Sequence, residues 1–255
     1  KTTNANSGSF WAIYQADTDC NSANTNDINI KFERALDATN SNSATEWTLV
    51  SVPVVGENTD DIEDALAAGS GGNAGKRAIG TFNNDTGAYV YYDDGASQTL
   101  TVGTGLAVTP TSGVTQVDFQ GTYKKGFTQV AIDKGSDGDY GNWNLIGNPF
   151  PAYYNLTNTA SNTDNFLLDN ASVLHDEYEA VYAWDGEQWT PQSEAEGSKN
   201  YIAPGEAFFV YSVSTGDGGG AFSGNTGWYQ NTINVDQGAN FNSGLARGSS
   251  ENKRE

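Results

Sequence analysis

The stretch that decides the fold is Trp143-Asn-Leu-Ile-Gly-Asn-Pro149, because an earlier stretch, Trp47-Thr-Leu-Val-Ser-Val-Pro53, has the same form. Each is typical of a β-strand that opens on tryptophan. Each closes on proline, which has no amide hydrogen to donate to a β-ladder. The two stretches therefore predict two copies of one β-rich unit within a single chain.

The features that follow each tryptophan strand recur in the same order. Thr59-Asp-Asp-Ile62 precedes Ala78-Ile-Gly-Thr-Phe82 in the first copy, as Thr163-Asp-Asn-Phe166 precedes Ala180-Val-Tyr-Ala-Trp184 in the second. In both copies a polar turn and a returning aromatic segment come next, as in a β-hairpin. This repeated order, at an offset of roughly 100 residues, favours a tandem duplication over a bias toward β-forming residues.

Each copy then continues through a glycine-containing turn into an apolar strand. These segments are Val102-Gly-Thr-Gly-Leu-Ala-Val108 and Ala203-Pro-Gly-Glu-Ala-Phe-Phe-Val210. Gly205 after Pro204 suits a type II turn. The second strand is apolar on both faces and should be buried, whereas Gln116–Gln120 alternates and should keep one face in water.

Local sequence patterns also predict two short helices and one turn or bulge. Asp60 and Glu63 have the spacing of a capping box and Gly69 can end the helix, which predicts about two helical turns. Phe166–Asn170 is expected to form a similar short helix. Gly147 and Asn148, before Pro149, suit a bulge or turn with unusual backbone angles.

We therefore predict an all-β protein with two tandem β-sandwich-like units and one short helix in each. The predicted boundaries are N-terminal strands packing on unit one (1–43), β unit one (44–124), an acidic linker loop (125–139), β unit two (140–226), and a C-terminal strand with a polar tail (227–255). The pattern leaves open whether the two units form separate sandwiches or share one core.

Composition narrows the classes of function. The 255 residues carry 12 basic and 32 acidic side chains, a formal net charge of −20. Such a surface repels nucleic acid and anionic lipid, so we expect neither as a partner. No apolar run approaches the roughly 18 residues of a membrane span. The start at Lys1 and the absence of a signal peptide favour a mature or excised fragment.

The single cysteine, Cys20, excludes an intrachain disulfide. It can be a free thiol, an intermolecular link or a tolerated lone residue. The polar stretches 1–9 and 236–255 are candidate arms for self-assembly by strand addition, with simple disorder as the alternative.

An acidic loop is the candidate metal site. Asp133, Asp137 and Asp139 lie among flexible glycines, and three carboxylates could wrap a hard cation such as Ca²⁺. The spacing is not that of an EF-hand. An ordinary acidic turn between strands is the alternative, since aspartate and glycine are common in turns.

Aromatic side chains supply a candidate carbohydrate site. Trp189, which follows the hairpin turn, is the first choice for an exposed ring, and Trp184 and Tyr201 are the further candidates. Aromatic faces stack on sugar rings while polar groups bond the hydroxyls. The alternative is that these rings belong to the core.

The residues offer little for catalysis. The only histidine, His175, lies close to Tyr178, and the two could form a lyase-like acid–base pair. Any pair of the many carboxylates could be chosen for glycoside hydrolysis, so none is informative. We therefore name no catalytic residue.

Three phrases together resemble a known group of proteins. Trp143-Asn-Leu-Ile-Gly-Asn-Pro-Phe-Pro151, Val181-Tyr-Ala-Trp-Asp-Gly-Glu187 and Ile202-Ala-Pro-Gly-Glu-Ala-Phe-Phe-Val210 occur in this order. The order resembles large secreted surface proteins of Bacteroidetes-type bacteria, the cargo of type IX secretion. The resemblance covers residues 44–224, weakly in unit one and well in unit two. The C-terminal sorting domain of such proteins is not in this chain, which fits a fragment.

The resemblance implies an extracellular or cell-surface location and a non-catalytic role as adhesin, stalk or assembling filament subunit. A carbohydrate-binding module of a polysaccharide-degrading protein is the alternative, and a polysaccharide lyase is a third reading. The implied partner is a surface glycan or another protein. No catalytic residues accompany the resemblance, and a fold does not fix a function.

Overall fold

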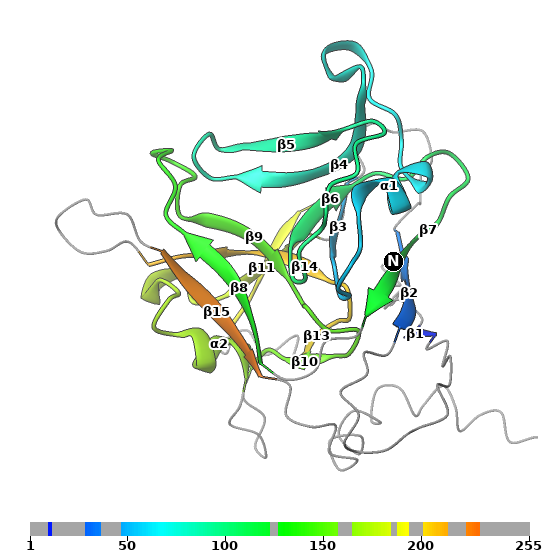
Figure 1. Ribbon diagram of the computed structural model, residues 1–255. Helices are drawn as coiled ribbons and strands as arrows, with labels where there is room; N and C mark the ends of the chain where they lie inside the picture. Colours follow the sequence, from blue (N-terminus) through cyan, green and yellow to red (C-terminus); the bar gives the residue numbers. More distant parts are fainter. Residues whose placement is uncertain are drawn as a thin grey trace, which may run out of the picture.

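The computed structural model describes residues 10–11, 29–36, 47–122, 127–157, 165–184, 188–193, 201–213 and 223–229. Within these residues the chain forms short antiparallel strands with a few helical turns, which confirms the predicted all-β fold (Figure 1). None of the described helices is long and apolar enough to cross a membrane.

Two four-stranded antiparallel sheets contain the segments that the sequence analysis paired. The first has the order β3–β6–β4–β5, formed by Thr48–Ser51, Gly105–Val108, Lys76–Asn83 and Ala88–Asp93. The second has the order β9–β14–β11–β12, formed by Trp143–Gly147, Ala207–Tyr211, Val181–Trp184 and Trp189–Gln192. In each sheet the first strand along the chain pairs with the last, and the last with the second.

The remaining strands form ribbons and a small sheet. β1 (Phe10–Trp11), β2 (Asn29–Ala35) and β7 (Gln116–Thr122) form one sheet, β8 (Phe127–Asp133) pairs with β15 (Ser223–Tyr229), and β10 (Tyr154–Asn155) pairs with β13 (Tyr201–Ile202). Figure 1 shows the β2–β7 and β8–β15 ribbons on opposite sides of the four-stranded sheets.

The residue register is also the same in the two four-stranded sheets. Ser51 lies opposite Gly105 in the first sheet, and Gly147 lies opposite Ala207 in the second. The second cross-strand contact agrees as well, because Gly80 faces Ala107 as Tyr182 faces Phe209. These pairs follow the sequence alignment of the two tryptophan strands and the two apolar strands.

Two of the buried clusters lie on the outer faces of the sheets. The cluster of the first sheet includes Val50, Leu106 and Ile79 together with Phe32 of β2 and Phe119 of β7. The cluster of the second sheet is built in the same way. Ile146, Phe208 and Val181 pack with Val130 and Ile132 of β8 and with Phe166 and Leu167. Each ribbon therefore covers one sheet and closes a sandwich-like layer.

A third cluster lies between the two sheets. Leu49 and Ala107 of the first sheet pack with Ala207 and Phe209 of the second, and partly buried rings surround them. Those rings include both strand-opening tryptophans, Trp47 and Trp143. Each sheet therefore has its own outer core, and the two sheets also share a further apolar layer between them.

Strand burial agrees with the two patterns tested. β14 is buried along Ala207–Val210, as expected for a strand that is apolar on both faces. β7 alternates, with Val117 and Phe119 buried and Gln116 and Gln120 exposed. In both strands, side chains of successive residues point to opposite faces.

The first predicted helix is shorter than expected. α1 covers Thr59–Ile62 and continues as a 3₁₀ turn, Glu63–Ala65, so it ends before Gly69. The N-cap is Asn58 rather than Asp60, because Asp60 already has helical backbone and its carboxylate accepts from the Ser97 hydroxyl. The 3₁₀ turn ends at Ala65. Beyond it, Leu66 forms an isolated β-bridge with Pro110, and the amide of Ala67 donates a hydrogen bond to the carbonyl of Thr109.

The second predicted helix is confirmed. α2 covers Phe166–Asn170, and the side chain of its N-cap, Asn165, accepts a hydrogen bond of 2.9 Å from the amide of Leu168. Phe166 and Leu167 are buried in the second cluster. The helix therefore forms where a capping residue is followed by apolar side chains.

Two local expectations need correction. Gly147 does not have the positive φ expected of it; it lies within β9, and its lack of a side chain allows close approach to Ser51. Within the segment 125–139, for which an acidic linker loop was expected, residues 127–133 form strand β8, because Val130 and Ile132 alternate into the core. Gly205 has the positive φ that a type II turn requires, at +62°.

Candidate functional site

The aromatic candidates of the second hairpin lie together at its end. Trp184 on β11 lies opposite Trp189 on β12, and their ring centroids are 5.0 Å apart. Trp189 also meets Phe209 edge-on at 5.2 Å, and it remains 46% exposed. The pair therefore offers one half-exposed indole that is held in place by two other rings.

The first hairpin carries a matching pair. Phe82 lies opposite Tyr89 at 5.6 Å, and Phe82 contacts Phe209 at 5.0 Å. Phe209 thus joins the aromatic ends of both hairpins. Burial raises the pKa of Tyr89 to about 12, so its hydroxyl remains protonated in ordinary buffers.

Tyr201 lies on a different sheet from the two tryptophans. It lies on β13 opposite Asn155 of β10, in a two-stranded sheet separate from that of Trp184 and Trp189. Sequence neighbours could not have revealed this pairing, because Tyr201 and Asn155 are far apart along the chain. The candidate sugar platform is therefore centred on Trp189.

Two of the three aspartate carboxylates in the acidic loop take part in loop structure. The side-chain Nδ2 of Asn84 donates a hydrogen bond of 2.6 Å to the carboxylate of Asp133. The carboxylate of Asp137 accepts from the backbone amides of Asp139 and Tyr140. The Asp139 side chain is exposed. Among the described residues, no group of three or more histidine, cysteine, aspartate or glutamate side chains is arranged to hold a metal ion. Calcium binding by this loop stays a prediction.

The acidic loop also fixes the tip of the first hairpin. The amide of Ser136 donates 2.8 Å to the carboxylate of Asp85, and the ring of Tyr140 lies against Gly87. Asn144 of β9 donates 2.8 Å to the carbonyl of Asp133 and closes the base of the loop. The loop is thereby a tie between β9 and the β4–β5 turn, a role that its composition did not reveal.

His175 and Tyr178 lie beside an aromatic stack. His175 Nδ1 accepts from the amide of Glu177 at 3.2 Å, which caps the 3₁₀ turn Asp176–Tyr178. The ring of Tyr178 stacks on Tyr211 at 4.5 Å, and Tyr211 meets Trp143 edge-on at 4.9 Å. Burial raises the pKa of Tyr211, which disfavours its phenolate. The lyase-like pair thus occupies positions with clear packing and capping contacts.

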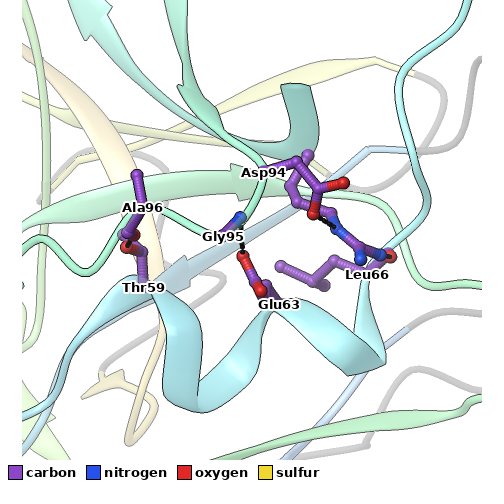
Figure 2. A network of polar contacts seen from close by, with 7 residues as sticks. Thr59, Glu63, Leu66, Asp94, Gly95 and Ala96 are labelled. Carbon is purple, nitrogen blue, oxygen red and sulfur yellow. Dashed lines mark hydrogen bonds and ion pairs between the residues drawn. The ribbon is translucent and has the colours of Figure 1, made fainter. Parts of the chain in front are cut away.

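A network of polar contacts holds the α1 segment to the end of β5 (Figure 2). The amide of Gly95 donates 2.9 Å to the carboxylate of Glu63, and the hydroxyl of Thr59 donates to the carbonyl of Ala96. Arg77 completes it with a 2.6 Å contact to Asp94 and a 3.2 Å bond to the carbonyl of Leu66. Side chains and backbone together therefore position residues 58–66.

Next to this network lies a residue that sequence reasoning missed. Glu57 is 1% exposed, its Oε2 accepts from the amide of Gln120, and its Oε1 has no hydrogen-bond partner. Burial, with a smaller effect from Asp61, raises the pKa of Glu57 to about 7. No sequence signal separates Glu57 from the other acidic residues, because its burial depends on β7, which is distant along the chain.

Cys20 and the arms at 1–9 and 236–255 lie outside the described residues. Comparisons with protein-family models, with curated proteins and with solved structures found no match for this chain.

Proposed function

We propose that this protein is a non-catalytic extracellular surface module, an adhesin, stalk or filament subunit, built from two copies of one β unit. The supporting observation is the use made of the conspicuous residues. Trp47 and Trp143 pack between the sheets, and Gly103 and Gly205 take positive φ at the turns that lead into β6 and β14. Residues committed to packing and chain reversal favour a scaffold role.

The duplication is part of the same proposal. Equal strand order and equal register are what two copies of one unit would retain. In such an arrangement the two copies bury a common apolar layer instead of exposing it, which suits a module that must remain soluble outside the cell. The resemblance to secreted surface proteins supports the proposed location.

The decisive experiment is a localisation and product assay on the producing cells and the purified chain. We expect antibody against the chain to label intact cells. We also expect no reducing ends or unsaturated sugars to be released from a panel of polysaccharides. Release of such products by the wild-type chain, lost in His175→Ala, would contradict the proposal and favour the lyase.

Carbohydrate binding is the second candidate, and one observation favours it. Trp189 presents a half-exposed indole supported by Trp184 and Phe209, which is the kind of surface on which a sugar ring stacks. A glycan array separates the candidates. Binding that disappears in Trp189→Ala supports the carbohydrate-binding module, and absence of binding leaves the scaffold role.

A further inference from the structure

The two four-stranded sheets have four outer strands, and three of them are protected from further pairing. On β3 the amide of Ser51 donates to the carbonyl of Gly205, and on β9 the amide of Gly147 donates to the carbonyl of Gly103, each at 2.9 Å. The outer strand β12 contains Pro191, which has no amide to offer another strand. These three edges are therefore unsuited to a further strand.

The fourth outer strand, β5, has neither kind of protection. Among the strands and bridges of the described residues it pairs with β4 alone, and Ala88-Tyr-Val-Tyr-Tyr-Asp93 contains no proline. Antiparallel strands exchange hydrogen bonds at alternate residue pairs, so the intervening amides and carbonyls of β5 point away from β4. Figure 1 shows β5 at the outer margin of its sheet. Such a row of backbone groups is a template for another strand.

The side chains of β5 hold the strand in place on both faces of the sheet. Tyr91 stacks on Trp47 with ring centroids 5.4 Å apart, and Tyr92, on the opposite face, packs against the cluster of the first sheet. Val90, beside the edge, remains 50% exposed. A partner strand would therefore meet an ordered backbone and an exposed β-branched side chain, and little further order is needed on this side of the interface.

The end of β5 carries more acidic than basic groups. Lys76 pairs with Asp93 and Arg77 pairs with Asp94, each at 2.6 Å. The carboxylate of Glu63 accepts a hydrogen bond of 2.9 Å from the backbone just beyond the strand. Two basic side chains thus face three carboxylates, and this end of the strand stays negative.

The turn that precedes β5 is acidic as well. The carboxylate of Asp85 accepts from the amide of Ser136 at 2.8 Å, and a Cβ atom at Gly87 would lie 3.3 Å from the carboxylate carbon of Asp137. Within the part of the chain that the structure describes, neither aspartate forms an ion pair. Both ends of β5 therefore attract basic groups and repel acidic ones.

We propose that the free edge of β5 binds an extended segment of another protein that is apolar in its centre and has a basic residue at each end. The segment extends the first sheet by one strand through backbone hydrogen bonds, and its end residues offset the two acidic groups. A second copy of this chain fits less well, because antiparallel pairing of two β5 strands brings Asp93 of each copy toward the acidic turn of the other. The edge would serve such a partner whether or not the module lies at the cell surface.

A synthetic peptide, Lys-Thr-Val-Thr-Val-Thr-Val-Lys, probes the edge in the full chain. We expect it to shift the amide NMR signals of Ala88–Asp93 and to slow hydrogen exchange at those amides of β5 that point away from β4. The same peptide with glutamate at both ends should bind at least about 10-fold more weakly at low salt, and the difference should shrink at about 1 M salt. Equal binding of the two peptides, or a β5 edge already protected from exchange without peptide, would overturn the proposal.

Two variants locate the binding on the strand. Val90→Lys places a charge on the centre of β5 without removing a buried group, and should weaken binding of the lysine-ended peptide by about 10-fold or more. Leu168→Lys adds the same charge on α2 at a position that is 51% exposed, and should bind as the wild type does. Equal losses in the two variants would contradict a site on β5. Self-association of the wild-type chain through β5 in sedimentation would replace the basic partner with a second copy, and the two-peptide comparison on the wild type stands even if Val90→Lys folds poorly.

Discussion

The amide of Ser51 donates a hydrogen bond of 2.9 Å to the carbonyl of Gly205, in the other half of the chain. The reverse contact is also present, because the amide of Gly147 donates 2.9 Å to the carbonyl of Gly103. Val50 bridges Glu206 as Ile146 bridges Thr104. The first strand of each four-stranded sheet is thus covered by the turn that leads into the last strand of the other, which protects both sheet edges.

This reciprocal contact makes Gly147 sensitive to substitution. A Cβ atom at Gly147 would lie 2.4 Å from the Cβ of Ser51 and 2.7 Å from the carbonyl oxygen of Glu206. We expect Gly147→Val to lower the free energy of unfolding by about 2 kcal/mol or more, because backbone and side chain must both move. Denaturant unfolding measures the effect.

A matched glycine serves as the control for this substitution. A Cβ at Gly138 would meet no heavy atom within 4 Å, and its φ is not positive. Gly138→Ala should therefore change stability by less than about 0.5 kcal/mol. Equal losses in both variants would show that the close contact with Ser51 does not limit the fold.

Asn148 is expected to be the most costly polar residue to remove. It is fully buried, its Nδ2 donates to the carbonyls of Ala152 at 2.7 Å and Ala203 at 3.1 Å, and its Oδ1 accepts from the amide of Phe150 at 3.0 Å. Asn148→Ala leaves these backbone groups without their partner and should cost roughly 2–4 kcal/mol. Thermal unfolding tests this, with exposed Asn73→Ala expected to be near neutral.

Stability should depend on pH through Glu57. The pKa of this group is raised from 4.5 to about 7 in the folded protein, so the folded state holds a proton that the unfolded state releases. The stabilisation is complete below pH 4.5 and is lost as pH rises through 7, by about 3 kcal/mol in total. Denaturant unfolding at several pH values should show this fall, superimposed on the other carboxylates.

Glu57→Gln separates this contribution from the rest. The variant should be more stable than the wild type at pH 8 and should lose the fall between pH 5 and 7. Glu177→Gln, which removes an exposed carboxylate far along the chain, should retain the wild-type profile. A Glu57→Gln variant less stable than the wild type at pH 8 would contradict this prediction, because it would mean that the folded protein stabilises the ionised carboxylate of Glu57.

Trp189 should separate binding from folding. Because the ring is 46% exposed and contacts Trp184 and Phe209, Trp189→Ala should cost about 1–2 kcal/mol of stability while the sheets remain intact. If the chain binds glycans, this variant should abolish the array signal, and Tyr178→Ala, at a different exposed ring, should keep it. Loss in both variants would place the binding surface elsewhere.

The sequence by itself determined the strand segments and their order. Period-two alternation in β7, the two-sided apolar run of β14 and the tryptophan and proline boundaries of β9 are local signals, and they need only neighbours along the chain. The length of the α1 helix was overestimated because the capping-box pattern takes no account of tertiary contacts. Leu66 and Ala67 form backbone contacts with another part of the chain instead of continuing the helix. The register of the paired strands was not predicted; it came from the structure, where Ser51 lies opposite Gly105 and Gly147 lies opposite Ala207.

Only the tertiary structure decided which residues meet between distant parts of the chain. The contact of Ser51 with Gly205, the hydrogen bond of Glu57 with Gln120, and the pairing of Tyr201 with Asn155 each join residues that are far apart along the chain. Local pattern carries no information about such pairs, because a buried carboxylate and an exposed one have the same sequence signature. Burial, and with it the pKa of Glu57, is a property of the packed fold.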